Sequence, residues 1–129
     1  MALDLTEIEI LLQRRYNSLQ DILRLTKEML ETISRGDEVS LSLMLDMRAE
    51  EIDRYEACQE EIWKKAEEGP QEAETVQRLM RSAPEDMLTS AKAEEQTVFM
   101  IRKKTTDLIK EVQQLDQLLN LRIHAGQPR

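Results

Sequence analysis

The chain has 129 residues, of which 34% are charged and only 3% are aromatic, and this length fits one domain of ordinary size. Its 26 acidic and 18 basic residues give a net charge of −8, which disfavours nucleic acid and anionic membrane surfaces as partners because both are negatively charged. Three Gly and three Pro are too few for the turns of a small all-β fold, so we expect an all-α domain.

The cysteine content and the amino terminus both favour a cytoplasmic protein. Cys58 is the single cysteine, so it forms no internal disulfide, which suits a reducing compartment. The start, MALDLTEIEILLQRR, places acids among its apolar residues and lacks the basic, then purely apolar, pattern of a signal peptide. No apolar stretch approaches the roughly 20 residues of a membrane span, so we expect no membrane insertion.

Residues 4–34 carry a long helical stripe of apolar residues. Its members recur at alternating spacings of three and four, which is typical of the seam of a coiled-coil-like helix. Ile8, Ile22 and Met29 lie beside the seam and widen it, so we expect this helix to contact two neighbouring helices. The seam consists of Leu5, Leu12, Tyr16, Leu19, Leu23, Thr26, Leu30 and Ile33.

The tripeptide Arg35-Gly36-Asp37 interrupts this pattern. It matches a cell-adhesion motif, but that interpretation needs secretion and an exposed loop, and three-residue motifs are common by chance. Glycine tolerates the left-handed conformation that ends helices, and aspartate caps the start of a new one. We therefore predict a tight turn, with Gly36 ending the first helix and Asp37 beginning the second.

The stripe resumes after the turn and continues to the helix-breaking pair Gly69-Pro70. Arg48 lies on this stripe, between apolar residues. Its stem packs while its charge reaches the rim of the helix, or it pairs with an acid on a neighbouring helix, for which Glu9 is the candidate. The resumed stripe consists of Leu41, Leu45, Ile52, Tyr55, Ile62 and Ala66.

Residues 71–81 form either a short additional helix or a connector, since they hold one small apolar cluster. Ser82 and Glu85 have the spacing of a capping box, which predicts that a third long helix begins there and runs to about Ile123. The predicted fold is an elongated antiparallel bundle of three long helices, forming a single domain over 1–123 with a disordered tail over 124–129.

The residue inventory argues against an enzyme. A di-metal bundle or a zinc site needs several His or Cys ligands, whereas the chain has one of each, His124 and Cys58. The three glycines, at 36, 69 and 126, do not form a phosphate-binding loop. We therefore expect no catalytic residues, no metal and no cofactor.

The third predicted helix carries more apolar residues than one packing face needs. Two interpretations remain open: a homo-oligomer interface, or a groove for an amphipathic helix of another protein. Among these residues, Phe99, Leu118 and Leu121 are the most probable partner-facing positions because they fall outside the main seam. The candidate partner-binding residues are Val98, Phe99, Ile101, Leu108, Val112, Leu115, Leu118, Leu119 and Leu121.

The stretch SRGDEVSLSLMLDMR, which follows a long helix, resembles flagellar export chaperones of the FlgN type, with the FliT type as a sister possibility. The resemblance covers about residues 10–65 and depends on Gly36, Asp37, Leu41, Leu45 and Arg48. The third helix matches in being long, amphipathic and rich in Gln and Asn, as in VQQLDQLLNLR.

This resemblance implies a cytoplasmic chaperone that binds the terminal amphipathic helices of flagellar hook-associated proteins, or of the filament cap, before type III export. The export apparatus is a further implied partner. The alternative is a coiled-coil scaffold or adaptor that self-associates and has no export role.

Overall fold

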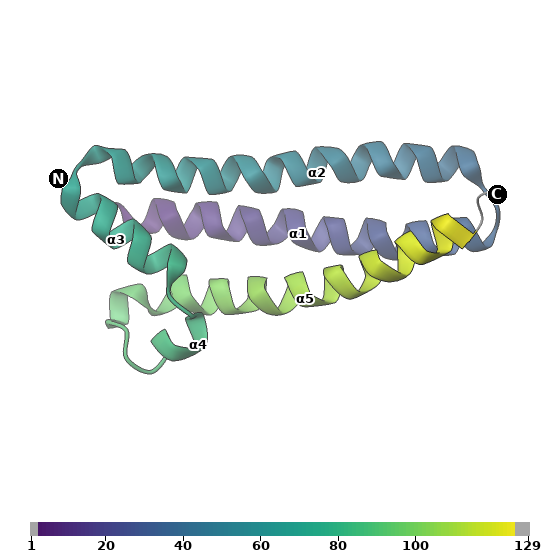
Figure 1. Ribbon diagram of the computed structural model, residues 1–129. Helices are drawn as coiled ribbons and strands as arrows, with labels where there is room; N and C mark the ends of the chain where they lie inside the picture. Colours follow the sequence, from purple (N-terminus) through teal and green to yellow (C-terminus); the bar gives the residue numbers. More distant parts are fainter. Residues whose placement is uncertain (1–2, 126–129) are drawn as a thin grey trace.

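The computed structural model describes residues 3–125, and these form an all-α bundle, as predicted. Three long helices lie side by side, with α1 (Leu5–Ser34) between α2 (Glu38–Lys64) and α5 (Gln96–Ala125) (Figure 1). The chain runs along the bundle, back and along again, so that α2 is antiparallel to both of its long neighbours. The connection from α2 to α5 contains the shorter helices α3 (Pro70–Arg81) and α4 (Pro84–Met87) and two 3₁₀ turns, Lys65–Glu68 and Ala93–Glu95.

The turn between α1 and α2 confirms the structural interpretation of Arg-Gly-Asp. Gly36 has φ of 69°, in the left-handed region that favours glycine. The backbone N–H of Asp37 donates to the carbonyl of Thr32 at 3.2 Å, which satisfies an end carbonyl of α1. The Asp37 carboxylate accepts from the Ser40 backbone N–H at 3.1 Å and from the Ser40 hydroxyl at 2.6 Å. These hydrogen bonds cap α2 and lower the pKa of Asp37.

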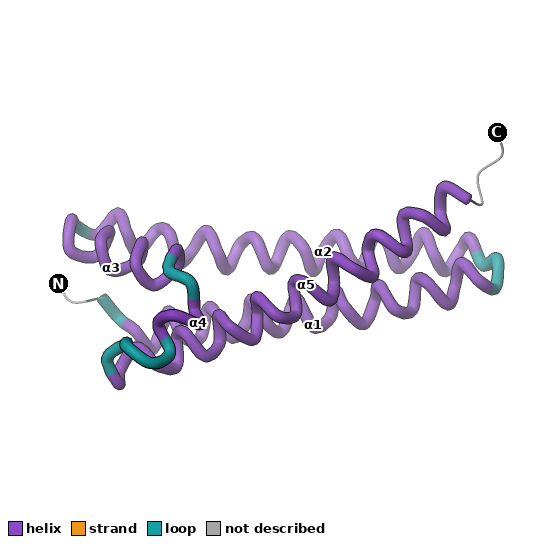
Figure 2. Tube along the Cα trace, turned by 60° about the horizontal axis from the view of Figure 1, so that its bottom comes forward, coloured by secondary structure: helices purple, strands orange, loops and turns teal. Residues whose placement is uncertain are grey.

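Helix α1 supplies the centre of the bundle. It contacts α2 on one side and α5 on the other, which confirms that its broad apolar stripe meets two neighbours. Seen from the direction of Figure 2, α5 crosses the α1–α2 pair obliquely. The carboxyl end of α5 approaches α2. Because α1 is covered on two sides, twelve of its residues are buried within the described structure, against one in α2, Ile62.

The largest part of the core lies at the end of the bundle where α3 packs, called here the α3 end. There α3 lies between the carboxyl end of α2 and the amino end of α5 (Figure 1), and its Val76 and Leu79 belong to the buried cluster. Residues 71–81 thus belong to a true helix, and this helix closes the space that three rods alone would leave open. The buried cluster consists of Ile8, Leu11, Leu12, Ile62, Val76, Leu79, Val98, Phe99 and Ile101.

Two smaller clusters continue the core toward the Gly36 turn. Leu19 and Ile22 meet Leu108 and Val112 near the middle of the bundle. At the other end, called here the turn end, Met29, Leu30 and Leu119 are buried, with Leu41, Met44, Leu115 and Ile123 packed against them. The core therefore becomes thinner from the α3 end to the turn end.

The predicted start of the third long helix is wrong. Helix α5 begins at Gln96, and Ser82 instead ends α3, while Ala83 precedes α4 and no side chain caps that helix. The capping box of Ser82 and Glu85 is therefore absent. Contacts distant in sequence hold the chain in this bent path: Arg78 forms an ion pair with Glu95, and Arg102 of α5 donates to the carbonyl of Leu79 at 2.9 Å.

The carboxyl-terminal tail predicted over 124–129 is helical at its beginning. His124 and Ala125 belong to α5, and the ring nitrogen Nδ1 of His124 lies 2.7 Å from the carbonyl oxygen of Asn120. The rest of that predicted tail lies outside the described residues. In the described part of the chain, no helix combines the length and the apolar character that crossing a membrane requires.

Candidate partner-binding surfaces

Most of the candidate partner-binding residues lie in the core of the chain itself. Their burial corrects the prediction that they face a partner, because the folded chain already covers them. These residues form the side of α5 that packs on α1 and α3. The buried residues of this set are Val98, Phe99, Ile101, Leu108, Val112 and Leu119.

Phe99 is the clearest correction, since it was expected to face outward. Its side chain is fully buried in the cluster that contains Ile8, Val76 and Leu79. The short helix α3 folds back against the start of α5. Phe99 is therefore buried although it lies outside the main apolar seam of α5. The spacing of residues within α5 cannot show this, because the covering residues come from another helix.

Leu118 and Leu121 do lie on the surface, with 39% and 69% of their area exposed. We call this pair the α5 patch. Leu115, the remaining residue of the predicted set, is half-buried and packs against the turn-end cluster. The α5 patch is therefore what remains of the predicted partner surface on the third long helix.

A second apolar surface lies on α2, where the sequence reasoning did not place one. Val39, Leu43 and Met47 are 83%, 61% and 42% exposed, and we call them the α2 strip. They follow each other at intervals of four along one side of the helix. Leu45 and Ile52, which were expected to continue the packed stripe of α2, are also exposed. The excess of apolar surface that was assigned to the third long helix thus lies largely on α2.

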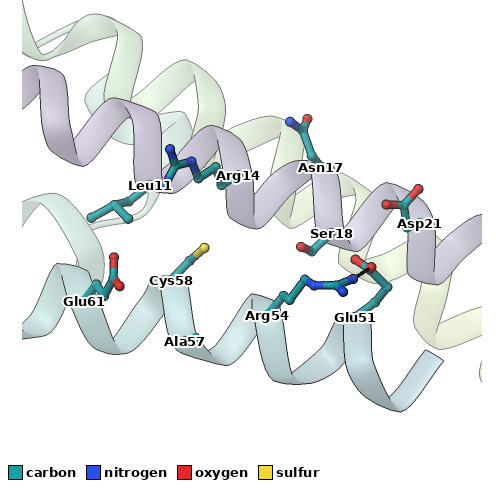
Figure 3. Close-up of a pocket in the computed structure, with 10 residues that line it drawn as sticks. All are labelled: Leu11, Arg14, Asn17, Ser18, Asp21, Glu51, Arg54, Ala57, Cys58 and Glu61. Atoms are coloured by element: carbon teal, nitrogen blue, oxygen red, sulfur yellow. Dashed lines mark hydrogen bonds and ion pairs between the residues drawn. The ribbon is translucent and has the colours of Figure 1, made fainter. Parts of the chain in front are cut away.

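A groove of about 470 Å³ lies between α1 and α2 (Figure 3). The side chains of Leu11, Ser18 and Cys58 point into the space between the two helices, whereas Asn17 points away from it. The groove is lined by Leu11, Arg14, Asn17, Ser18 and Asp21 of α1 and by Glu51, Arg54, Ala57, Cys58 and Glu61 of α2.

Small side chains and acids give this groove its character. Ser18, Ala57 and Cys58 have short side chains, so another helix can come close to the backbones of α1 and α2 there. Burial raises the pKa of the Cys58 thiol, and the neighbouring carboxylate of Glu61 raises it further. The thiol is therefore held in its neutral form, which is the less reactive one. Arg54 forms an ion pair with Glu51 along the α2 wall.

Arg15, on α1, is a buried cation that the sequence reasoning did not single out. Its Nη1 donates to Oε1 of Gln59 at 3.1 Å, and its guanidinium lies 5.3 Å from the ring centroid of Tyr55. Burial lowers the pKa of Arg15. These contacts join α1 to α2 near the middle of the bundle and fix how the two helices are aligned along their length.

Arg48 forms an ion pair, but not with the predicted acid. Its Nη2 lies 2.6 Å from Oδ1 of Asp116 on α5, so Glu9 is not its partner. This is a direct polar link between α2 and α5, which otherwise meet mainly through the turn-end cluster. The side chain of Arg48 is 15% exposed. The interpretation that Arg48 pairs with an acid on a neighbouring helix is therefore confirmed, with Asp116 in place of Glu9, and the interpretation that its charge reaches a solvated rim is wrong.

The described residues include no group of three or more His, Cys, Asp or Glu side chains placed to hold a metal ion. Comparisons with protein-family models, with curated proteins and with solved structures found no match to this chain.

Proposed function

We propose that this chain is a cytoplasmic secretion chaperone. It binds the amphipathic terminal helices of flagellar hook-associated proteins, or of the filament cap, and prevents their assembly before type III export. It acts by binding and has no catalytic step. The stretch SRGDEVSLSLMLDMR motivates the flagellar assignment through its resemblance to export chaperones of the FlgN type.

One observation supports a binding role above others: long helices of the bundle keep large apolar side chains outside the core. Val39 and Leu43 on α2 and Leu121 on α5 are mostly exposed. Exposed apolar surface on a helical protein is a common feature of sites that receive a partner helix. A client segment that forms a coiled coil only after assembly offers the complementary apolar stripe.

The same surfaces favour a second candidate, a scaffold that self-associates through α2 or α5. The net charge of −8 opposes it, because two copies bring like charges together. The eleven acids and four bases of residues 37–68 concentrate that repulsion around α2. A homo-oligomer therefore needs the less charged α5 patch as its contact.

The test is to mix the purified full chain with a purified full-length hook-associated or filament-cap protein from the same cell. A second sample contains that client without its terminal helix. We expect a complex with the full-length client only, seen by size-exclusion chromatography with light scattering. Complex formation should also delay polymerisation of the client.

Two results would contradict the proposal. Equal binding of both client forms would mean that the terminal helix is not what is recognised. Absence of any client complex, together with a stable oligomer of the chain alone, would favour the scaffold. Light scattering of the unmixed chain provides this comparison in the same experiment.

A further inference from the structure

We propose that the α1–α2 hairpin binds its partner helix along the α2 strip and the α1–α2 groove, and that the helix it takes is apolar on one side and basic along its flanks. This inference deepens the proposed function, since it rests on the premise that the chain captures helices. It names the surface and the chemistry of the occupant, and it places the main contact away from the α5 patch.

The α2 strip leads directly into the groove. Each step of four residues turns a side chain by about 40° around a helix axis, so Val39, Leu43 and Met47 wind progressively toward α1. Their exposure falls in the same order, from 83% to 61% to 42%. The next step of four is Glu51, which lines the groove and has a side chain only 14% exposed. Strip and groove are therefore one continuous surface.

The two parts of this surface offer different contacts to a helix. The strip offers large apolar side chains that water now covers, and their burial is favourable. The groove offers the short side chains of Ser18, Ala57 and Cys58, which permit a helix to approach closely without a clash. Leu11, which is buried in the core, closes the groove at its far end.

The length of the surface matches one helix. From Val39 to Glu61 the α2 backbone is continuously helical, and this span is about 33 Å at ~1.5 Å per residue. A partner helix of about 20 residues would cover it. It would lie beside α1 and α2 on the side where the groove opens, as a fourth long helix that completes a four-helix bundle.

Charge decides what kind of helix fits. Arg54 is already paired with Glu51, and Arg14 is the other base of the groove. Acids outnumber these bases along both parts of the surface, so Lys and Arg beside the apolar stripe of a partner would be stabilised and Glu and Asp would be repelled. The acids along the surface are Glu38, Asp46 and Glu50 by the strip and Asp21, Glu51 and Glu61 in the groove.

The same charges argue against a second copy as the occupant. An α2 strip packed on its own copy would place Asp46 and Glu50 against each other across the contact, with like-charge repulsion as the result. The α5 patch lacks this constraint, since Gln114 and Gln117 are among its nearest helical neighbours. Charge complementarity therefore favours a basic partner helix on the hairpin.

The test uses a fluorescent 20-residue peptide of Leu and Lys with helical amphipathic spacing, and a matched peptide in which Glu replaces every Lys. Fluorescence anisotropy measures binding to the full chain at physiological salt. We expect the Leu/Lys peptide to bind and the Leu/Glu peptide to bind at least tenfold more weakly. Leu43→Gln should weaken Leu/Lys binding by about tenfold, because it removes one large apolar contact.

Two further variants separate this surface from general attraction between opposite charges. Leu121→Gln makes the same change on α5 and should alter binding by less than about twofold. Ala57→Phe fills the groove at an exposed position, so it should weaken binding while the far-ultraviolet circular dichroism and the melting temperature stay unchanged. Equal loss in Leu43→Gln and Leu121→Gln would overturn the proposal. So would equal affinity for the two peptides, or no binding of either.

The failure of this inference can be told from failure of the proposed function. If a flagellar client binds and the complex is insensitive to Leu43→Gln and Ala57→Phe, the function stands and this surface is wrong. If the Leu/Lys peptide binds in a Leu43-dependent way and no flagellar client does, the surface stands without that function. A dimer of the chain that Leu43→Gln dissociates would overturn the choice of occupant.

Discussion

The two ends of the bundle solve the same packing problem in different ways. At the α3 end, α3 inserts Val76 and Leu79 between α2 and α5, and nine residues form one buried cluster. At the turn end no additional helix is present in the described structure, and α5 itself leans toward α2 to bury Met29, Leu30 and Leu119. The long helices are the same at both ends, so the fourth helical element accounts for the denser core.

This difference shows why the bundle has an apolar strip on α2 near the turn and none near α3. Where α3 is present, the last turns of α2 pack inward through Ile62, and Trp63 is half-buried. Where it is absent, no helix among residues 3–125 covers Val39, Leu43 and Met47. The part of α2 that lies over the thinnest core is thus the part that exposes an apolar surface to a partner.

The largest expected effect is on the core at the α3 end. Phe99→Ala removes a fully buried aromatic side chain and should lower the free energy of unfolding by about 3–5 kcal/mol. Leu119→Ala at the turn end should cost about 2–3 kcal/mol, because a smaller cluster relaxes more easily around the cavity. Urea unfolding followed by circular dichroism measures both. Equal losses would contradict a looser turn end, because Phe99→Ala removes more buried atoms than Leu119→Ala.

Gly36→Ala tests the turn that closes the thinner end. Nothing lies within 4 Å of a Cβ atom added at this position, so the loss comes from the backbone, whose φ is 69°. We expect a decrease of about 1–2 kcal/mol in the free energy of unfolding. Gly36→Asn is the matched control and should lose less, since asparagine adopts the left-handed conformation more readily. A larger loss for asparagine would indicate that space limits this site.

Glu95→Gln tests the polar contact that holds the α3 end together. The hydrogen bond from Arg78 lowers the pKa of Glu95 below its ordinary value of 4.5, so the ionised form stabilises the fold above that pH. The variant should lose about 1 kcal/mol at pH 7, a modest value because Arg78 is 40% exposed to screening solvent.

This loss should disappear as the pH falls below 4.5 toward the lower pKa of the folded state, where Glu95 gains a proton and the ion pair is lost. Urea unfolding of both proteins between pH 7 and pH 3 measures the difference. Glu94→Gln, at an exposed neighbouring position, serves as the control. A difference that does not begin to shrink as the pH falls from 4.5 to 3 would show that the charge of Glu95 is not what stabilises this end.

The smallest effect belongs to the surface of the turn end. Leu121 is 69% exposed, so Leu121→Gln should change the free energy of unfolding by no more than about 0.5 kcal/mol. Thermal unfolding of this variant beside Leu119→Ala compares two leucines that lie two residues apart. Similar losses in both would mean that the α5 patch is covered, for example by a second copy of the chain.

The sequence predicts best those features that depend on neighbouring residues. The turn at Gly36 and the cap at Asp37 follow from backbone preferences within a few residues. The position of α1 between two helices follows from Ile8, Ile22 and Met29, which widen its stripe, and all three are buried. These features need no knowledge of what the rest of the chain does.

Features that depend on distant residues are those that the sequence does not reveal. Ser82 and Glu85 have the spacing of a capping box, yet Arg102 and Glu95 draw the chain into another path there. The periodicity of α2 indicates that Arg48 faces a neighbour but cannot identify it as Asp116 on α5. The same limit explains why Phe99 was placed outside: its position depends on α3.

The central position of α1 also determines the order in which the protein can be completed during synthesis. Leu30 and Leu119 share one cluster although roughly 90 residues separate them, and contacts so distant in sequence form slowly. On the ribosome, α1 and α2 emerge long before α5, so one side of α1 waits without its permanent cover. Of the three long helices, the one that is made first is thus the last to be enclosed, and a chain shortened within α5 would leave that side open to unwanted contacts.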